Sequence, residues 1–144
     1  MKEHRKRHQR ICRIRDIEQN RLLALLGELA KIENTLLQLQ SKQKQLITTR
    51  DKQLETSHAQ SVTSQQNILV WLERTSETIQ SLDNEIQLND KQRRQAADRI
   101  SKKQTRIKSL ERLAERIQEM IKAEFENQQM LIADENAMKD YARN

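Results

Sequence analysis

The sequence predicts an all-α protein, built as a two-helix antiparallel coiled-coil hairpin. Apolar residues recur at alternating intervals of four and three through two long stretches, which is the pattern of a coiled-coil seam, the line of core-facing positions. Between the stretches the pattern turns polar and its phase slips by one residue. The chain has no proline, one glycine and one each of Trp, Tyr and Phe, a composition typical of long exposed helices rather than a globular core.

The longer stretch covers residues 68–138. Fourteen of its twenty-one seam positions are apolar, and the phase is constant throughout. These apolar positions are Ile68, Leu72, Ile79, Leu82, Ile86, Ala96, Ile100, Ile107, Leu110, Ala114, Ile117, Ile121, Leu131 and Met138. At about 1.5 Å of rise per residue, such a helix would be about 105 Å long, which no globule of this size could contain. We expect a helix over about residues 64–141.

An earlier stretch predicts a first helix over about residues 2–55. Its seam residues are Leu22, Leu25, Leu29, Ile32, Leu36, Leu39 and Leu46, and Ile11, Ile14 and Ile17 precede them in a looser phase. Gly27 lies inside this helix and costs about 1 kcal/mol relative to alanine. Close packing of a neighbouring helix is a benefit that would offset this cost.

A polar connection over about residues 56–63 separates the two helices. Thr63 and Gln66 have the spacing of a capping box, which predicts that the second helix starts near Ser64. Folding the chain near residue 60 places apolar seam residues opposite one another, for example Ile14 opposite Ile107. We therefore expect residues 1–144 to form one elongated hairpin that is monomeric when free. One unbroken helix in a parallel dimer is the alternative.

Positive charge is concentrated in two blocks. Residues 1–15 contain seven Lys and Arg and one acid, and residues 90–112 contain nine and three, so each block carries +6. The hairpin brings both blocks to its open end, where residues 1–15 face residues 106–120. Beyond about Met120 the second helix outruns the first, and its apolar residues have no partner: Ile121, Phe125, Met130, Leu131, Met138 and Tyr141. Such residues suggest a docking surface, with a frayed end as the alternative.

No arrangement typical of an enzyme is present. One glycine cannot build a phosphate-binding loop, and a two-helix hairpin has no pocket, so we expect no catalytic activity and no cofactor. His4, His8 and Cys12 share one helix face, but the nearby arginines repel a cation and no fourth ligand is near, so we expect no metal. The longest apolar runs have five residues and no secretory signal is visible, which favours a cytoplasmic protein.

Four segments, residues 11–15, 25–29, 106–116 and 134–137, together resemble segments of a known family. This family is the FliJ family of flagellar export proteins, with its YscO/HrpO branch in virulence injectisomes. Residues 106–116, RIKSLERLAER, resemble the basic stretch in the second helix of the family. The run Asp134-Glu135-x-Ala137 resembles its C-terminal Asp-Glu-x-Ala ending. Residues 25–29 are similar to the enterobacterial flagellar member, and residues 11–15 are similar to the opening of the injectisome branch.

The resemblance implies a non-catalytic stalk or adaptor of a type III protein export apparatus, similar to the stalk subunit of rotary ATPases. Its open end would dock in a hexameric export ATPase and stimulate it. Its shaft would contact the export gate, a membrane protein, and export chaperones, at the cytoplasmic side of an inner-membrane machine. The residues expected at the ATPase are Arg5, Arg7, Arg10, Arg13, Arg15, Leu113, Met120 and Ile121, and those expected at the gate or a chaperone are Leu69 and Trp71.

Two other functions fit the same sequence. A coiled coil that binds nucleic acid would grip phosphates with residues 2–15, but no aromatic is interleaved there to stack on bases, so we expect no nucleic acid. A plain structural coiled coil would need no special partner. For Trp71 the structural alternative is a side chain that covers the end of the core beside the connection.

Overall fold

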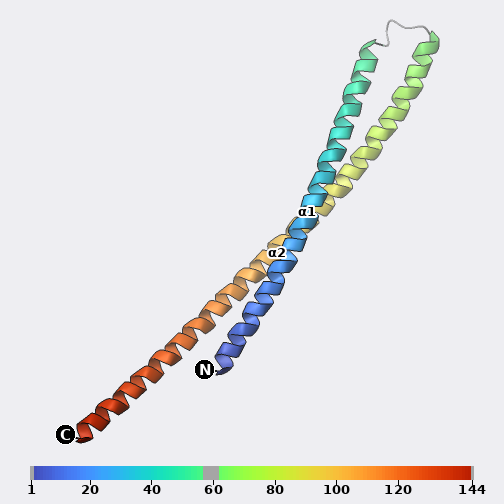
Figure 1. Ribbon diagram of the computed structural model, residues 1–144. Coiled ribbons are helices and arrows are strands. Elements are labelled where there is room, and N and C mark those ends of the chain that lie inside the picture. The colour runs from blue at the N-terminus through green and yellow to red at the C-terminus, as the bar shows by residue number, and fades with distance from the viewer. Residues whose placement is uncertain (1, 57–61, 144) are drawn as a thin grey trace. The chain divides into compact units, whose positions relative to one another are not determined.

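The computed structural model describes residues 2–56 and 62–143, which form two α-helices (Figure 1). Helix α1 covers Lys2–Thr56 and helix α2 covers Val62–Arg143, and no described residue belongs to a strand. The predicted bounds, 2–55 and 64–141, are close to these. Helix α2 begins at Val62 rather than near Ser64, so the capping box does not mark its start. Residues 57–61 of the predicted connection lie outside the described residues.

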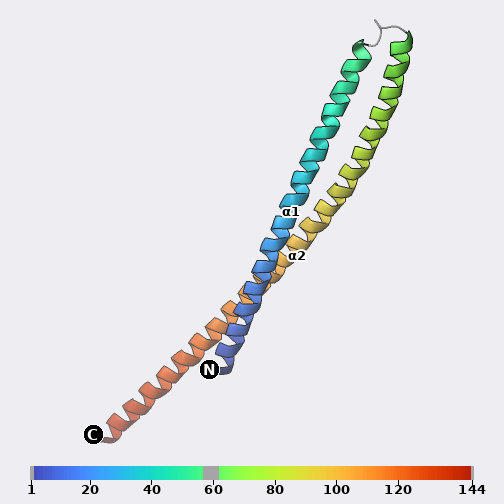
Figure 2. The same ribbon diagram turned by 45° about the vertical axis from the view of Figure 1, so that its right-hand side comes forward.

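Each of the two helices contributes to two compact units. The first unit comprises Met1–Ala24 and Ser101–Asn144, and the second comprises Leu25–Ile100. In each unit a segment of α1 packs antiparallel to a segment of α2, as both views show (Figures 1 and 2). The predicted fold class, an all-α antiparallel hairpin of two helices, is confirmed.

The less exposed residues of α1 recur at alternating intervals of four and three. They are His4, His8, Ile11, Arg15, Glu18, Leu22, Leu25, Leu29, Ile32, Leu36, Leu39, Gln43, Leu46, Arg50 and Gln53, with Cys12 and Ile47 beside them. The predicted apolar run from Leu22 to Leu46 therefore faces α2. Ile14 and Ile17 do not, because they are 40% and 46% exposed. Ile11 and Glu18 hold the positions that continue the seam.

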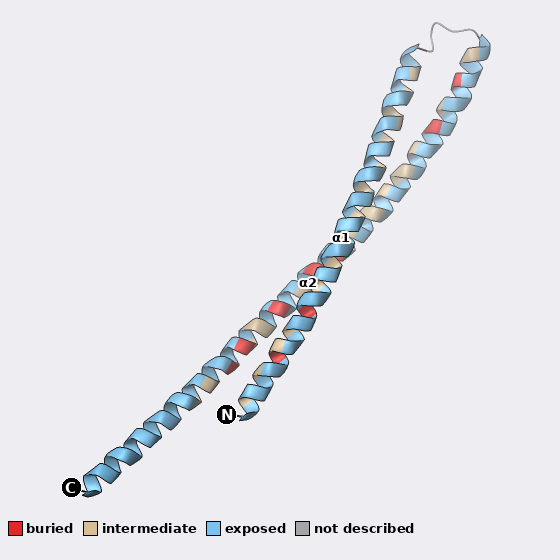
Figure 3. Cartoon of the chain, in the orientation of Figure 1, coloured by how far each residue is buried: buried red, intermediate tan, exposed pale blue. Residues whose placement is uncertain are grey.

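The seam of α2 keeps the predicted phase without a slip. Every position of that phase from Ile68 to Glu124 is buried or partly buried, and every described residue after Glu124 is exposed. A few further residues are partly buried outside this phase: Ser64, Asp83, Asp90, Glu111 and Leu113. Figure 3 shows the buried positions and the uniformly exposed end of α2. Because the phase is constant, one face of α2 stays toward α1 in each unit.

The core of the first unit is small and apolar. Ile11, Ala114 and Ile117 are buried together, with Ile117 only 1% exposed. Partly buried residues pack around them: Cys12, Leu110, Leu113 and Ile121. The predicted pairing of Ile14 with Ile107 is wrong, because Ile14 lies off the seam while Ile107 is buried and borders a shallow groove with Leu22.

Polar seam residues in the second unit find partners on the helices. Gln43 donates its side-chain N–H to the carbonyl of Ile79 at 3.4 Å, which joins α1 to α2. The seam of α2 is also polar at Asn89 and Arg93, and both find partners within α2: Asn89 donates to the Glu85 carbonyl at 2.9 Å and Arg93 donates to Asp90 Oδ1 at 2.8 Å. These bonds matter because a polar group left unpaired in a seam costs stability.

Gly27 lies on the exposed side of α1. A Cβ built there would meet no heavy atom within 4 Å, and the backbone has no positive φ. The expected close packing of a neighbouring helix at Gly27 is therefore wrong for the described chain. The cost of this glycine has no compensating contact within α1 or α2.

Candidate interaction surface in the first unit

A buried carboxylate organises the interface of the first unit. Glu18 is 4% exposed, and its Oε2 lies 2.7 Å from the Nζ of Lys103 on α2. Arg21 approaches Oε1 at 3.1 Å from the same helix, and Arg106 approaches it at 3.8 Å from α2. One acid thus engages three cations, two of which belong to the second basic block.

The pKa of Glu18 lies below its ordinary value. The main cause is the hydrogen bond from Lys103, and the charges of Lys103, Arg21 and Arg106 add to it, while burial acts in the opposite direction. Glu18 is therefore ionised at neutral pH. Its negative charge is paired most closely with Lys103, whose side chain is 24% exposed, so this lysine contributes less to any positive surface.

A similar cluster lies in the second unit at the other end of the same basic block. Arg93 and Arg94 contact Asp90 at 2.8 and 3.1 Å. The hydrogen bond from Arg93 is the main cause that lowers the pKa of Asp90. Part of the positive charge of residues 90–112 is therefore paired with acidic side chains within the protein. This block is not a uniformly free positive surface.

The N-terminal basic segment, residues 2–15, is different. Lys2, Lys6, Arg7, Arg10 and Arg13 are exposed, and none makes an ion pair with another described residue. Arg5 is exposed and has a polar contact. Lys2, Lys6, Arg7, Arg10 and Arg13 therefore present positive charge that no described acid pairs with.

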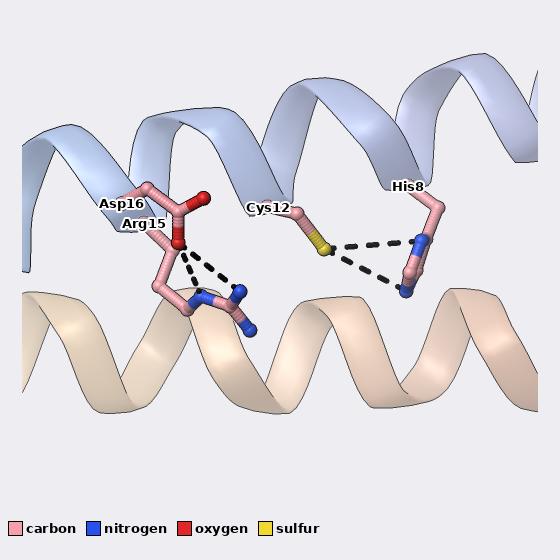
Figure 4. A network of polar contacts seen from close by, with 4 residues as sticks. All are labelled: His8, Cys12, Arg15 and Asp16. Carbon is pink, nitrogen blue, oxygen red and sulfur yellow. Dashed lines mark hydrogen bonds and ion pairs between the residues drawn. The ribbon is translucent and has the colours of Figure 1, made fainter.

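Arg15, the remaining predicted arginine, is half-buried at a seam position. Its guanidinium donates to Asp16 Oδ1 at 3.1 and 3.3 Å (Figure 4). Figure 4 also shows that His8 and Cys12 project from α1 toward α2 beside Arg15. Because Arg15 is paired and faces the neighbouring helix, it is less available to a partner than Arg10 or Arg13.

The histidines and the cysteine at the start of α1 line the seam. His4 Nε2 contacts Glu124 Oε1 at 3.0 Å, and His8 lies 3.8 Å from the Cys12 sulfur. Among the described residues there is no group of three or more His, Cys, Asp and Glu that could hold a metal ion. The contact between His4 and Glu124 forms the last seam layer of the unit.

Beyond this layer α2 continues without α1. Both Figure 1 and Figure 2 show α2 extending past the start of α1. We call residues 125–143 of α2 the overhang. Its large apolar side chains are half or more exposed: Phe125 50%, Met130 65%, Leu131 63%, Ile132 52%, Met138 75% and Tyr141 86%. The overhang is the main apolar surface of the unit that lacks a described partner.

The three apolar residues predicted at the ATPase occupy different environments. Met120 is 50% exposed, whereas Leu113 and Ile121 are partly buried against the core of the unit. Ile121 was expected in the unpaired part of α2. This expectation is wrong, because the start of α1 packs along α2 as far as Glu124, which contacts His4. Only Met120 is as accessible as the overhang residues.

The two residues predicted at the gate or a chaperone lie in the second unit. Leu69 is 64% exposed and Trp71 is 37% exposed, and both lie on α2 beside the seam residues Ile68 and Leu72. Trp71 is thus partly covered. It was expected to cover the end of the core beside the connection, and residues 57–61 of that connection lie outside the described residues.

We compared the chain with known proteins. No family model, curated protein or solved structure matches it. None of the described helices is long and apolar enough to cross a membrane. The first unit presents two exposed surfaces that a partner could bind, the N-terminal basic segment and the overhang.

The position of Glu18 as a buried seam residue was not predicted from the sequence. Counting back from Leu22 by four and by three gives Glu18, Arg15, Ile11, His8 and His4, all of which the structure protects. The strict phase of the downstream seam was therefore a usable signal. The three isoleucines near the N-terminus obscured it, since two of them lie off the seam.

Proposed function

We propose that the protein is a non-catalytic stalk or adaptor of a type III protein export apparatus, flagellar or injectisome. It would dock in the export ATPase hexamer, stimulate ATP hydrolysis, and link the ATPase to the export gate and to chaperones. The proposal rests on the resemblance to the FliJ and YscO families and on one structural observation. In the first unit the exposed apolar overhang lies next to an N-terminal segment in which five exposed cations pair with no described acid: Lys2, Lys6, Arg7, Arg10 and Arg13.

The two surfaces suit different steps of docking. Cations of the N-terminal segment would speed the encounter with an acidic ring mouth, and salt would weaken this attraction. Apolar side chains such as Leu131 and Met138 would then hold the docked state, because peripheral charges affect the association rate more than residence time. A single asymmetric partner in a symmetric ring contacts the subunits unequally, which would bias assembly or the order of hydrolysis.

The central experiment measures ATP turnover by the purified ring with and without this protein. One variant changes Arg5, Arg7, Arg10 and Arg13 together to Ser. A second variant ends at Glu124, which removes the overhang but keeps the contact between His4 and Glu124. We expect both variants to lose stimulation while their helical content is retained.

Matched point variants distinguish the loss of overhang side chains from the loss of exposed apolar side chains elsewhere. Leu131→Ser and Met138→Ser remove side chains that are 63% and 75% exposed, and Leu88→Ser removes one of similar exposure, 57%, in the second unit. The overhang variants should lower stimulation and Leu88→Ser should not. If the arginine and truncation variants both stimulate normally while folded, the ring does not dock here and the proposal fails.

The gate and chaperone contact is tested separately. Leu69→Ser and Trp71→Ala should weaken capture of the gate's cytoplasmic domain or of a chaperone, with little change in ATPase stimulation. If Trp71→Ala instead lowers helicity and Tm and leaves capture intact, the tryptophan has the structural role of covering the core.

A further inference from the structure

Four cations of the N-terminal basic segment share one face of α1. Lys2, Lys6, Arg10 and Arg13 follow one another at intervals of four, four and three residues, which places them in a single line along a helix. We call these four residues the basic stripe. All are exposed, and the stripe lies on the side of α1 opposite the seam, so α2 does not cover it.

The basic stripe has no internal counter-charge. None of its members pairs with a described acid, and like charges four residues apart disfavour a helix. Cations in the first turns of a helix also oppose its macrodipole. The stripe is therefore unfavourable for the isolated helix, and a negatively charged partner would relieve this repulsion.

Two apolar residues accompany the stripe. Ile17 continues its line four residues after Arg13 and is 46% exposed, and Ile14 lies beside it and is 40% exposed. A partner with negative charge but no apolar groups would leave both isoleucine side chains exposed. The face thus combines a row of cations with an apolar end, which is the composition of helices that lie at membrane surfaces.

We propose that this face of α1 docks on an anionic phospholipid surface. The phosphates attract the basic stripe, and Ile14 and Ile17 enter the headgroup region. A straight row of cations fits a flat charged surface along its whole length, and clusters of four or more Lys and Arg are sufficient for such attraction. Nucleic acid fits less well, because the face has no aromatic residue to stack on bases and leaves both isoleucines exposed.

This inference does not depend on the proposed ATPase contact, although Arg10 and Arg13 belong to both surfaces. Vesicles contain no ring, so the two ideas can fail separately. A membrane contact would hold the first unit at a bilayer without any spanning helix.

The test is co-sedimentation of the full chain with vesicles. Vesicles that contain phosphatidylglycerol are compared with vesicles of neutral phosphatidylcholine. The stripe variant changes Lys2, Lys6, Arg10 and Arg13 to Gln. The control variant removes the same charge from exposed lysines of the second unit: Lys42, Lys44, Lys52 and Lys91. We expect the stripe variant to bind anionic vesicles up to roughly 1,000-fold more weakly and the control variant to change much less.

A second variant decides between lipid and other polyanions. Ile14→Ser with Ile17→Ser keeps all charges, so it should weaken vesicle binding but leave any binding to duplex DNA or polyglutamate unchanged. The inference is overturned if the control and stripe variants lose equal affinity, or if neutral vesicles bind as well. It is also overturned if duplex DNA binds more tightly than vesicles at equal phosphate concentration and the isoleucine variant has no effect. Circular dichroism confirms that each variant stays helical.

Discussion

The carboxylate of Glu18 and the ammonium of Lys103 meet at 2.7 Å inside the interface between α1 and α2. The glutamate side chain is 5% exposed and the lysine side chain 24% exposed. Such a pair favours one alignment of two helices, since a shifted register would leave both charges buried and unpaired. We infer that this contact sets the register of the first unit.

Removing one partner of this pair should destabilise the protein more than removing both. Glu18→Met leaves Lys103 half-buried without its acid, and Lys103→Met leaves the glutamate with Arg21 and Arg106 only. The double variant Glu18→Met with Lys103→Met should recover part of the lost Tm, because an apolar pair can replace a buried ion pair. Thermal unfolding of the four proteins measures this coupling. Strictly additive Tm changes would show that the pair does not act as a unit.

Stability should fall in acid because two carboxyl groups have lowered pKa values in the folded chain. The ordinary values are 4.5 for Glu18 and 3.8 for Asp90. The unfolded chain binds protons first as the pH falls, so the stabilisation is complete above these values and is lost as the pH drops through the lower folded pKa. Tm measured from about pH 7 to about pH 3 should decline in this range.

A matched variant identifies the source of the acid sensitivity. Glu18→Gln should have a lower Tm than the wild type at neutral pH, and the difference should shrink toward acid. Asp90→Asn should behave in the same way with a smaller effect, because its side chain is 30% exposed. A constant difference between Glu18→Gln and wild type at every pH would contradict the assignment.

The apolar core of the first unit should depend on Ile117. Ile117→Ala removes a side chain that is 1% exposed, and large-to-small changes of this kind cost about 2–5 kcal/mol. Ile132→Ala makes the same chemical change on the overhang, at 52% exposure, and should cost less than about 1 kcal/mol. Urea unfolding of both variants measures the free energies. Equal costs would mean that the first unit does not have the core described.

Gly27→Ala should stabilise the protein by about 1 kcal/mol, since alanine is the better helix former. The new methyl group meets nothing within 4 Å. The gain corresponds to a rise in Tm of about 2–4 °C for a chain of this size. Ala30→Gly, at an exposed position one turn away, should produce a loss of similar size. A fall in Tm for Gly27→Ala would indicate a contact at Gly27 in solution, for example with a second copy of the chain.

The sequence by itself determined that two helices form and which face of α2 is covered. The constant phase from Ile68 to Ile121 identified that face, because periodicity is a property of one helix and needs no partner. The polar stretch and slipped phase near residue 60 marked the break. The unpaired end of α2 was also foreseen, since one helix is longer than the other.

Only the tertiary structure decided the alignment of the two helices near the N-terminus. Ile11 and Glu18 face α2 there, while Ile14 and Ile17 are exposed, although hydrophobicity alone favours an isoleucine over a glutamate as a core residue. The buried position of Glu18 depends on Lys103, 85 residues away in the chain and 2.7 Å away in space. A charge can be buried only where an opposite charge meets it, and that meeting is a property of the folded pair of helices.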